Sequence, residues 1–277
     1  MDTRGGMRDE DFRFFRSLIH KETGIWLGDQ KRSMLASRLS RRLRELRLDD
    51  LHAYRVWLET ADAGGSELVH AINRVTTNKT DFFREPEHFI VLKDWVAGRG
   101  SATRLWCAAS STGEEPYSLA MTLAEVFGMQ APWSILATDI DTEVLAAAAA
   151  GIYGEDRLRT LPAGMKPRYF LRGRGKYSGQ ACVRPEVRRH VEFRRVNLVG
   201  EQWPVGERFD AVFCRNVLIY FDRETQQRVV ERLLGRLVPD GLLFLGHSES
   251  LHWMAHQVET VAHTVYRKRV GQWGGGQ

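Results

Sequence analysis

CAASSTGEEPYSLAM, residues 107–121, is the stretch that decides the fold. It has the pattern of a strand end, a loop and the start of a helix, which is the arrangement that binds nucleotides in α/β proteins. Pro116 suits the first turn of that helix, where its missing N–H costs nothing. The same stretch carries Glu114 and Glu115 at the position where a phosphate would normally lie.

The two glutamates indicate what kind of ligand this loop accepts. Two carboxylates at the start of a helix would repel a diphosphate and attract an ammonium or sulfonium group. Gly113 is the only glycine in the loop, so the Gly-x-Gly-x-x-Gly fingerprint of dinucleotide sites is absent. The alternative is that both glutamates only complement the helix dipole.

Strands and helices alternate around this stretch from about residue 104 onward. Apolar segments typical of strands, and the helical segments between them, occupy residues 103–109, 116–128, 133–139, 142–151, 191–198, 209–215, 223–238 and 241–247. Such alternation predicts a mainly parallel sheet with helices on both faces. The segment TVAHTVYRKR, residues 260–269, could pair antiparallel with the strand at 241–247.

The chain before this region has a helical pattern from residue 8 to residue 75. In SMLASRLSRRLRELRL, residues 33–48, leucines recur at helical spacing, and Arg38, Arg41 and Arg44 lie on the opposite side. We therefore predict an all-α domain over residues 1–75, a linker over 76–90 and an α/β domain over 91–277. A glycine-bearing interruption at 157–190 is predicted to be a small β insertion within the second domain.

Composition excludes several classes of protein. No window approaches 18 consecutive apolar residues, so no membrane-spanning helix is expected, and the first residues lack the apolar core of a secretory signal. Three widely spaced cysteines argue against a disulfide framework or a zinc cluster and fit a reducing cytoplasm. Two basic regions, 31–47 and 157–190, point to an acidic partner, which could be nucleic acid or a protein surface.

Asp139 narrows the ligand further. It ends the strand WSILATD, 26 residues after Gly113, where an acid in nucleotide-binding sheets accepts hydrogen bonds from ribose hydroxyls. Its alternative role is a helix N-cap, for which Asp141 and Thr142 are better placed. A nucleoside with a cationic amino-acid end is S-adenosylmethionine, so the sequence suggests a methyltransferase.

Several longer motifs carry a resemblance to a known family. They are TTNKTDFFREPEHF (76–89), STGEEPYSLA, ATDIDTEVL, VNL, FDAVFCRNVLIYFD (209–222) and GHSESL. Together they resemble the chemotaxis receptor methyltransferases, the CheR family, from about residue 10 to residue 268. The resemblance implies an α/β, Rossmann-like methyltransferase domain that depends on S-adenosyl-L-methionine, with a small β insertion, preceded by a small all-α domain.

The resemblance also implies roles for residues in the cofactor site. Glu115 would hold the methionine amino end and Asp139 the ribose. The other implied cofactor-binding residues are Asn78, Thr80 and Arg84 over the cofactor, Asn197 and Leu198 beside the adenine, and Arg215 and Asn216 along the site. Arg84 and Tyr220 would lie near the transferred methyl and are the implied catalytic residues. Cys107 departs locally from the family, at a strand end that needs only a small residue.

The implied substrate is a glutamate side chain on the cytoplasmic helical bundle of a chemoreceptor, which would become a methyl ester while S-adenosyl-L-homocysteine is formed. Arg38, Arg41 and Arg44 are predicted to bind this acidic surface. The loop RGRGKYSGQACVR within 157–190 resembles that of family members that bind a receptor C-terminal peptide. No metal, nucleic acid or membrane insertion is expected, since His252 and His256 lack a third ligand nearby.

Two alternatives differ in class from this interpretation. A nucleic-acid methyltransferase that modifies base amines would carry an Asn/Asp-Pro-Pro-aromatic run where this chain has CRNVLIYF, residues 214–221, without proline. A non-catalytic receptor-binding module could retain the fold, although Arg84, Glu115, Asp139 and Tyr220 argue against lost cofactor chemistry.

Overall fold

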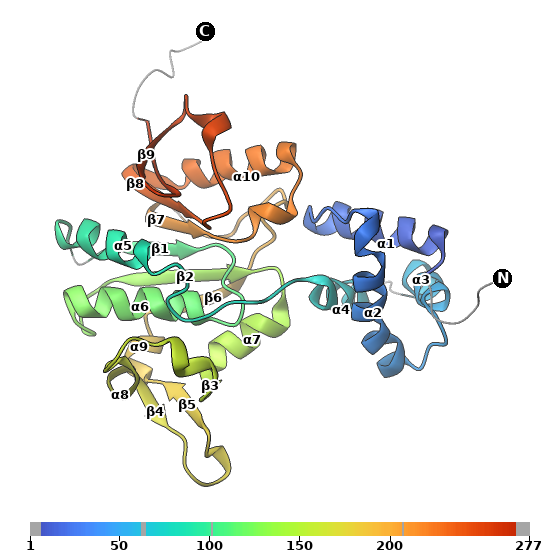
Figure 1. Cartoon of the computed structure of the whole chain (residues 1–277), viewed down its shortest axis with the longest axis horizontal. Helices are drawn as coiled ribbons and strands as arrows, with labels where there is room; N and C mark the ends of the chain where they lie inside the picture. The colour runs from blue at the N-terminus through green and yellow to red at the C-terminus, as the bar shows by residue number, and fades with distance from the viewer. Residues whose placement is uncertain (1–6, 62–64, 101, 207, 270–277) are drawn as a thin grey trace.

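The computed structural model describes residues 7–61, 65–100, 102–206 and 208–269. The outer ends of the two predicted domains, residues 1–6 and 270–277, lie outside the described residues. Figure 1 shows a group of helices from the N-terminal part on one side, a central sheet with its helices, and a small β-sheet projecting below.

The N-terminal part is helical, as the sequence predicted. Its elements are α1 (Asp9–Thr23), the short 3-10 helix η1 (Asp29–Lys31), α2 (Arg32–Leu46), α3 (Leu51–Thr60) and α4 (Ser66–Val75). Gly24 ends α1 in the left-handed conformation, with φ at 72°, and Asp50 caps α3 by accepting a hydrogen bond from the Ala53 N–H. Leu35 and Leu39 on the predicted stripe of α2 are fully buried. The core of this domain forms between α1, α2, α3 and α4, which contributes Ala71 and Val75.

One large sheet forms the centre of the second domain. Within the described residues it has seven strands in the order β6-β2-β1-β7-β8-β10-β9. The strands are β1 (Arg104–Cys107), β2 (Ser134–Asp139), β6 (Val191–Arg195), β7 (Phe209–Cys214), β8 (Leu237–Leu245), β9 (Val258–Ala262) and β10 (Val265–Lys268). The first five named are parallel, and β10 is antiparallel to β8, which confirms the predicted pairing of the last segment. The chain turns at Thr264, φ 54°, so the segment predicted as one strand, 260–269, contains the end of β9, the turn and β10.

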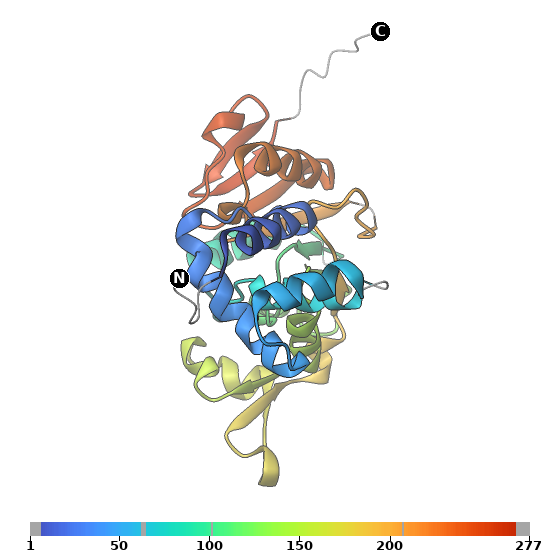
Figure 2. The same cartoon turned by 90° about the vertical axis from the view of Figure 1, so that its right-hand side faces the viewer.

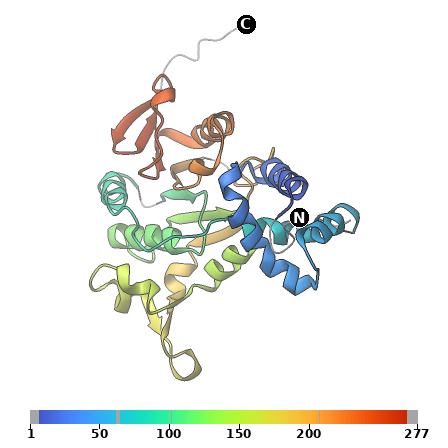
Figure 3. The same ribbon diagram turned by 45° about the vertical axis from the view of Figure 1, so that its right-hand side comes forward.

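Helices cover both faces of this sheet, as Figure 3 shows. They are α5 (Glu87–Ala97), α6 (Glu114–Phe127), α7 (Thr142–Ala150) and α10 (Arg223–Gly235), with short 3-10 turns η4 (Leu218–Tyr220) and η5 (His252–Met254). Successive residues of a strand point to opposite faces. Leu105 and Cys107 accordingly pack in the core under α5 and α6, while Trp106 between them packs in the core under α10.

The predicted β insertion is a separate three-stranded antiparallel sheet. The strands of this sheet, in the order β3-β5-β4, are β3 (Ile152–Gly154), β4 (Phe170–Arg172) and β5 (Gln180–Val183). The insertion also contains the short helices η2 (Arg157–Thr160), α8 (Met165–Tyr169), η3 (Gly175–Tyr177) and α9 (Pro185–Arg188). Its first strand begins five residues before the predicted start at 157, directly after the helix that Gly151 ends. Phe82 of the linker contacts Tyr153 and Phe170, with ring centroids 4.9 and 5.7 Å away, so the insertion also anchors the linker.

The strand order fixes where a ligand can bind. From β1 the chain moves outward to β2 and β6, then returns to β7 on the other side of β1. Ligands of open α/β sheets bind at such a switch point, beyond the carboxyl ends of the strands. No helix among the described residues is long and apolar enough to cross a membrane.

Candidate functional site

A pocket opens at the switch point, between the loops that follow β1, β2, β6 and β7. The linker between the two domains closes one side of it, and residues 23 and 25 reach it from the N-terminal domain. Every residue predicted for the cofactor or for catalysis lines this one pocket: Asn78, Thr80, Arg84, Glu115, Asp139, Asn197, Leu198, Arg215, Asn216 and Tyr220. The structure therefore brings together residues from five separate segments, while their individual roles stay predictions.

The two glutamates of the loop after β1 have different surroundings. Glu114 is fully buried and accepts a hydrogen bond from Arg157 Nε at 3.1 Å, which ties the insertion to the start of α6. Glu115 lines the pocket instead. Its carboxylate accepts a hydrogen bond from the Cys107 thiol at 3.2 Å and one from Arg215 Nη1 at 2.5 Å. Only Glu115 is thus placed to meet a ligand.

Cys107 has a function that its size alone did not indicate. Burial and the neighbouring Glu115 charge raise the pKa of this thiol well above its usual value, so it stays protonated. A protonated thiol is a weak hydrogen-bond donor. Cys107 therefore orients the carboxylate of Glu115 as well as filling the strand end.

Asp139 lies at the opposite side of the loop after β1. Its carboxylate accepts hydrogen bonds from two backbone groups, Ser111 N–H at 2.8 Å and Asp141 N–H at 3.0 Å. Burial raises the pKa of Asp139 to about 6, although both backbone bonds oppose the shift. Asp141 caps α7 through the N–H groups of residues 143 and 144, as the spacing predicted, so Asp139 is not needed as the cap.

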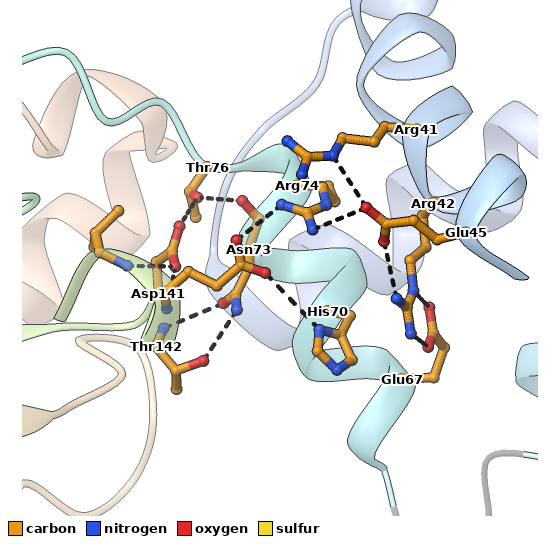
Figure 4. Close-up of polar contacts among 12 residues, drawn as sticks. Arg41, Arg42, Glu45, Glu67, His70, Asn73, Arg74, Thr76, Asp141 and Thr142 are labelled. Atoms are coloured by element: carbon orange, nitrogen blue, oxygen red, sulfur yellow. Dashed lines mark hydrogen bonds and ion pairs between the residues drawn. The ribbon is translucent and has the colours of Figure 1, made fainter. Parts of the chain in front are cut away.

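The linker binds this side of the pocket through hydrogen bonds. Asn78 Nδ2 and Thr76 Oγ1 donate to Asp141 at 2.7 and 2.8 Å, and Ser111 Oγ donates to the Asn78 carbonyl at 2.8 Å. Asn73 of α4 bonds both the backbone and the hydroxyl of Thr142, and Figure 4 shows these contacts side by side. The amide of Asn78 is therefore used in holding the linker against Asp141.

The three arginines predicted to bind the substrate have different surroundings in the structure. Arg38 donates to the linker, reaching the Thr76 carbonyl at 3.0 Å and Thr77 Oγ1 at 2.9 Å. Arg41 and Arg44 are exposed, and Arg41 pairs with Glu45 at 3.0 Å. Figure 4 shows Glu45 between Arg41, Arg42 and Arg74, which joins the exposed face of α2 to α4. Arg38 therefore holds the linker that closes the pocket, whereas Arg41 and Arg44 are exposed and can contact a partner protein.

Arg215 organises the wall opposite Asp139. It is 4% exposed, and besides Glu115 it donates to the Glu85 carboxylate at 2.8 Å and to the Arg84 carbonyl at 2.6 Å. Glu85 also accepts from Asn216 Nδ2 at 3.2 Å. Burial opposes ionisation of Glu85, but the hydrogen bond and charge of Arg215 outweigh it and lower the pKa to about 2. The buried cation of Arg215 thus lies between two carboxylates.

Sequence reasoning missed two acids of this wall, Glu85 and Glu249. Glu249 is 5% exposed and accepts hydrogen bonds from the N–H groups of Asn216 at 2.8 Å, Gly246 at 2.6 Å and Ile219 at 3.3 Å. It thereby holds the turn that carries Asn216 and Tyr220. The signal was available, because Glu85 lies in the quoted motif TTNKTDFFREPEHF and Glu249 in GHSESL.

The N-terminal domain reaches the site at two points. The backbone N–H of Trp26 donates to the Tyr220 carbonyl at 2.8 Å, and Asn197 Nδ2 donates to the Glu22 carbonyl at 2.7 Å. The Asn197 side-chain oxygen accepts from the Val199 N–H at 3.1 Å, so both ends of this amide hold protein loops. Arg84 keeps 39% of its side chain exposed and donates to the Lys79 carbonyl at 3.2 Å.

In the part of the chain that the structure describes, two groups of acids and histidines are close enough to hold an ion: Glu85 with His88 and His247, and Glu10 with Asp11 and His52. Glu85 is already engaged by Arg215. Burial and the charge of Arg215 lower the pKa of His88 to about 4, so it is neutral. His252 and His256 belong to neither group. The absence of a bound metal stays a prediction.

Comparisons with known proteins agree with the geometry. A family model described as "CheR methyltransferase, SAM binding domain" matches residues 78–267, and one described as "CheR methyltransferase, all-alpha domain" matches residues 10–76. The chemotaxis protein methyltransferase of Salmonella typhimurium is 47% identical, over 96% of this chain and 92% of its own length. Its Escherichia coli counterpart is 46% identical over 96% and 93%, and chemotaxis protein methyltransferase 2 of Pseudomonas aeruginosa 46% over 93% and 92%.

Proposed function

The chain belongs to the CheR family of chemotaxis methyltransferases, whose sheet domain binds S-adenosylmethionine, and we propose that it methylates glutamate side chains of chemoreceptors. The observation that carries the proposal is one pocket lined by Glu115, Asp139, Arg84 and Tyr220. The new bond joins a carboxylate oxygen of the substrate to the methyl carbon, and the C–S bond breaks with its electron pair left on sulfur. An anion and a sulfonium cation give a neutral ester and S-adenosyl-L-homocysteine, without proton transfer.

The residues of the pocket fit S-adenosylmethionine at each part of the molecule. Asp139 keeps carboxylate lone pairs for ribose hydroxyls, because backbone donors such as the Ser111 and Asp141 N–H groups occupy only part of its acceptor sites. Glu115 offers a negative charge for the amino end. Leu198, Val196 and Ile140 line the pocket next to Asp139 and supply apolar contact for the adenine. Bound there, S-adenosylmethionine supplies the methyl group in an activated, sulfonium form.

Catalysis in this proposal rests on alignment. A substrate glutamate is already ionised at neutral pH, so the site needs no general base. Arg84, half-exposed at the pocket, would orient that carboxylate, and Tyr220 would position the methyl or the acceptor. Loss of water from the carboxylate on entry would raise its reactivity. Too tight a pair with Arg84 would stabilise the ground state equally, which fits its partial exposure.

Docking on the receptor would use two separate surfaces. Arg41 and Arg44 on α2 would meet the acidic, cytoplasmic helical bundle, while Arg38 stays with the linker. The β insertion would hold a receptor C-terminal peptide as an added strand beside β4, which is an edge strand. Exposed Leu171 and Tyr177, with Arg172 and Arg174, offer this edge apolar and cationic contacts.

The peptide contact is testable by itself. Such a tether would raise the effective concentration of the substrate without changing the chemistry. Titration of the protein with a receptor C-terminal pentapeptide, followed by calorimetry, should give saturable binding that a charge-reversed Arg172→Glu protein loses. Absence of binding at millimolar peptide, with S-adenosylmethionine binding intact, would remove the tether and leave the methyltransferase proposal standing.

The decisive experiment incubates the protein with methyl-labelled S-adenosylmethionine and a receptor cytoplasmic fragment. We expect label on the fragment that base releases as methanol, since methyl esters are base-labile. Asp139→Ala protein is the matched control and should label poorly. Base-stable label on nucleic acid would favour the alternative enzyme class. Cofactor binding without any transfer would identify a non-catalytic module.

A further inference from the structure

Tyr220 is flanked by two large apolar side chains that are exposed. Trp26 is 58% exposed and Ile219 is 49% exposed. Trp26 comes from the N-terminal domain, and its N–H donates to the Tyr220 carbonyl at 2.8 Å, while Ile219 precedes Tyr220 in the chain. Single exposed apolar residues are ordinary, but apolar residues gathered beside a site mark an interaction surface.

A shallow groove continues this surface along the start of α10. Ile219, Arg223 and Trp253 line it together. The guanidinium of Arg223 lies 4.7 Å from the centre of the Trp253 ring, so the aromatic face supports the cation. Arg223 is exposed, and in the described part of the chain no carboxylate forms an ion pair with it. Its charge is therefore available to an acidic partner.

Trp26 is held in place before any partner arrives. The His20 ring meets it edge-on at 5.6 Å, and His20 Nε2 lies 2.9 Å from the carboxylate of Asp222, the residue that caps α10. In Figure 2, α10 (orange) lies next to the first helix (dark blue), on the face turned to the viewer. The two domains therefore meet at this surface, where the Trp26 backbone is bonded to the second domain and the Trp26 indole packs against His20.

We propose that Trp26, Ile219, Arg223 and Trp253, the α10 rim, form the surface on which the glutamate-bearing helix of the receptor lies. This inference rests on the proposed function. A glutamate that enters the pocket beside Tyr220 must bring its neighbouring residues onto the atoms that flank Tyr220. Residues three or four positions away lie on the same face of a helix. One such apolar residue packs on Trp26 or Ile219, and one such acid pairs with Arg223.

The occupant follows from the chemistry of the rim. Apolar side chains with one unpaired arginine fit an amphipathic, acidic helix better than a nucleic-acid backbone, which would need several cations. Arg41 and Arg44 on α2 add positive charge at a second place, so the receptor would contact both domains. The rim sets which glutamate reaches the pocket, whereas α2 attracts the bundle as a whole.

The test compares Trp26→Ala and Arg223→Glu with matched controls at equally exposed positions. The controls are Ile90→Ala on α5, which is 61% exposed, and Arg228→Glu, an exposed cation on α10. We measure kcat and KM on a receptor cytoplasmic fragment and the Kd of S-adenosylmethionine by calorimetry. Trp26→Ala should raise KM by about tenfold, the effect of one well-packed side chain, and Arg223→Glu by about threefold to fivefold, as for an exposed ion pair. Both variants should leave the cofactor Kd within about twofold.

Ionic strength separates the two contacts. The Arg223→Glu effect should shrink as salt is raised, and the Trp26→Ala effect should persist, because salt screens only the charge pair. Rim variants with wild-type KM, or with KM changes equal to those of the controls, would overturn the proposal while leaving methyl transfer established. A parallel loss of cofactor affinity would also overturn it, by assigning the residues to the pocket. Wild-type protein that fails to methylate the receptor would instead refute the proposed function.

Discussion

The two walls of the cofactor pocket are built in opposite ways. On one wall Asp139 is held by backbone N–H groups only, and burial raises its pKa to about 6. On the other wall Glu85 and Glu115 both bind Arg215, and the pKa of Glu85 falls to about 2. Both walls hold acids that are at least half-buried, yet among the described residues only the second has a cation paired with its acids.

The difference indicates which acids hold the protein and which await a ligand. A buried carboxylate without a cation is costly, and a ligand that donates hydrogen bonds to it recovers part of that cost on binding. A carboxylate paired with arginine already has a counter-charge and hydrogen-bond donors. Removing the arginine leaves the negative charge buried in the protein interior without either. Arg215 and Glu85 are therefore expected to carry stability and Asp139 cofactor affinity, while Glu115, which lines the pocket and also pairs with Arg215, contributes to both.

The largest effect is expected from Arg215→Ala. Both Glu85 and Glu115 would lose their cation in a buried place, which should lower the free energy of unfolding by about 3–5 kcal/mol. Denaturant titration at pH 7 measures this, with Arg228→Ala as the exposed control. Because unpaired buried carboxylates take up protons more readily, the deficit should narrow as the pH falls. An Arg215→Ala protein as stable as the control would break the comparison.

Asp139→Ala comes next and should act on binding. Losing charge-assisted hydrogen bonds to the ribose should cost roughly 1.5–3 kcal/mol of binding free energy, a rise in Kd of about ten- to a hundredfold. Stability should change little or increase at pH 8, since a folded-state pKa raised above the usual value means stability that is lost as pH rises. An unchanged Kd in folded Asp139→Ala protein would rule out the ribose role.

Glu249→Gln should have a smaller, kinetic effect. Glu249 accepts hydrogen bonds from three N–H groups, and an amide offers only one acceptor oxygen to them. One or two of these donors would lose their acceptor, which costs about 1–3 kcal/mol of stability for each. Because Glu249 holds the turn at Asn216 to Tyr220, we expect a lower kcat with a nearly unchanged cofactor Kd. Glu224→Gln, an exposed change on α10, is the control. Equal loss of kcat in both variants would contradict a positioning role.

How much of this could be predicted from the sequence differs between the walls. Asp139 was found because it ends a strand, and the pair Glu114 and Glu115 because it begins a helix, whereas the choice of Glu115 within that pair came from the family resemblance. Glu85 was missed because its role depends on Arg215, 130 residues away, and Glu249 because two of its three donors, Asn216 and Ile219, lie 33 and 30 residues away. Local pattern predicts an acid in a loop to be solvated.

Polar side chains inside the quoted motifs show the same limit. Asn78 and Asn197 were assigned to the cofactor by resemblance, and both line the pocket. Their amides, however, bind Asp141 and the Glu22 carbonyl, contacts that join segments far apart in sequence. The elements of the sheet could be predicted because apolar periodicity is local. Even there, the hairpin of β9 and β10 and the early start of the insertion depended on single turns.

The smallest predicted effect concerns pH and separates the walls without any mutation. Ribose hydroxyls donate more strongly to an ionised Asp139 than to a protonated one, so the Kd of S-adenosylmethionine should rise as the pH falls below about 6, by up to about tenfold per unit. Glu85, with its pKa near 2, stays ionised throughout this range, and the Arg215 wall should not change. Calorimetry between pH 7 and pH 5 is suitable, since the cofactor's amino group, with an ordinary pKa of about 8, remains protonated there. Asp139→Asn protein should bind weakly but with a flat profile. A wild-type Kd that is constant over this range would mean that Asp139 binds its ligand without titrating, and the contrast between the walls would then lie in their geometry alone.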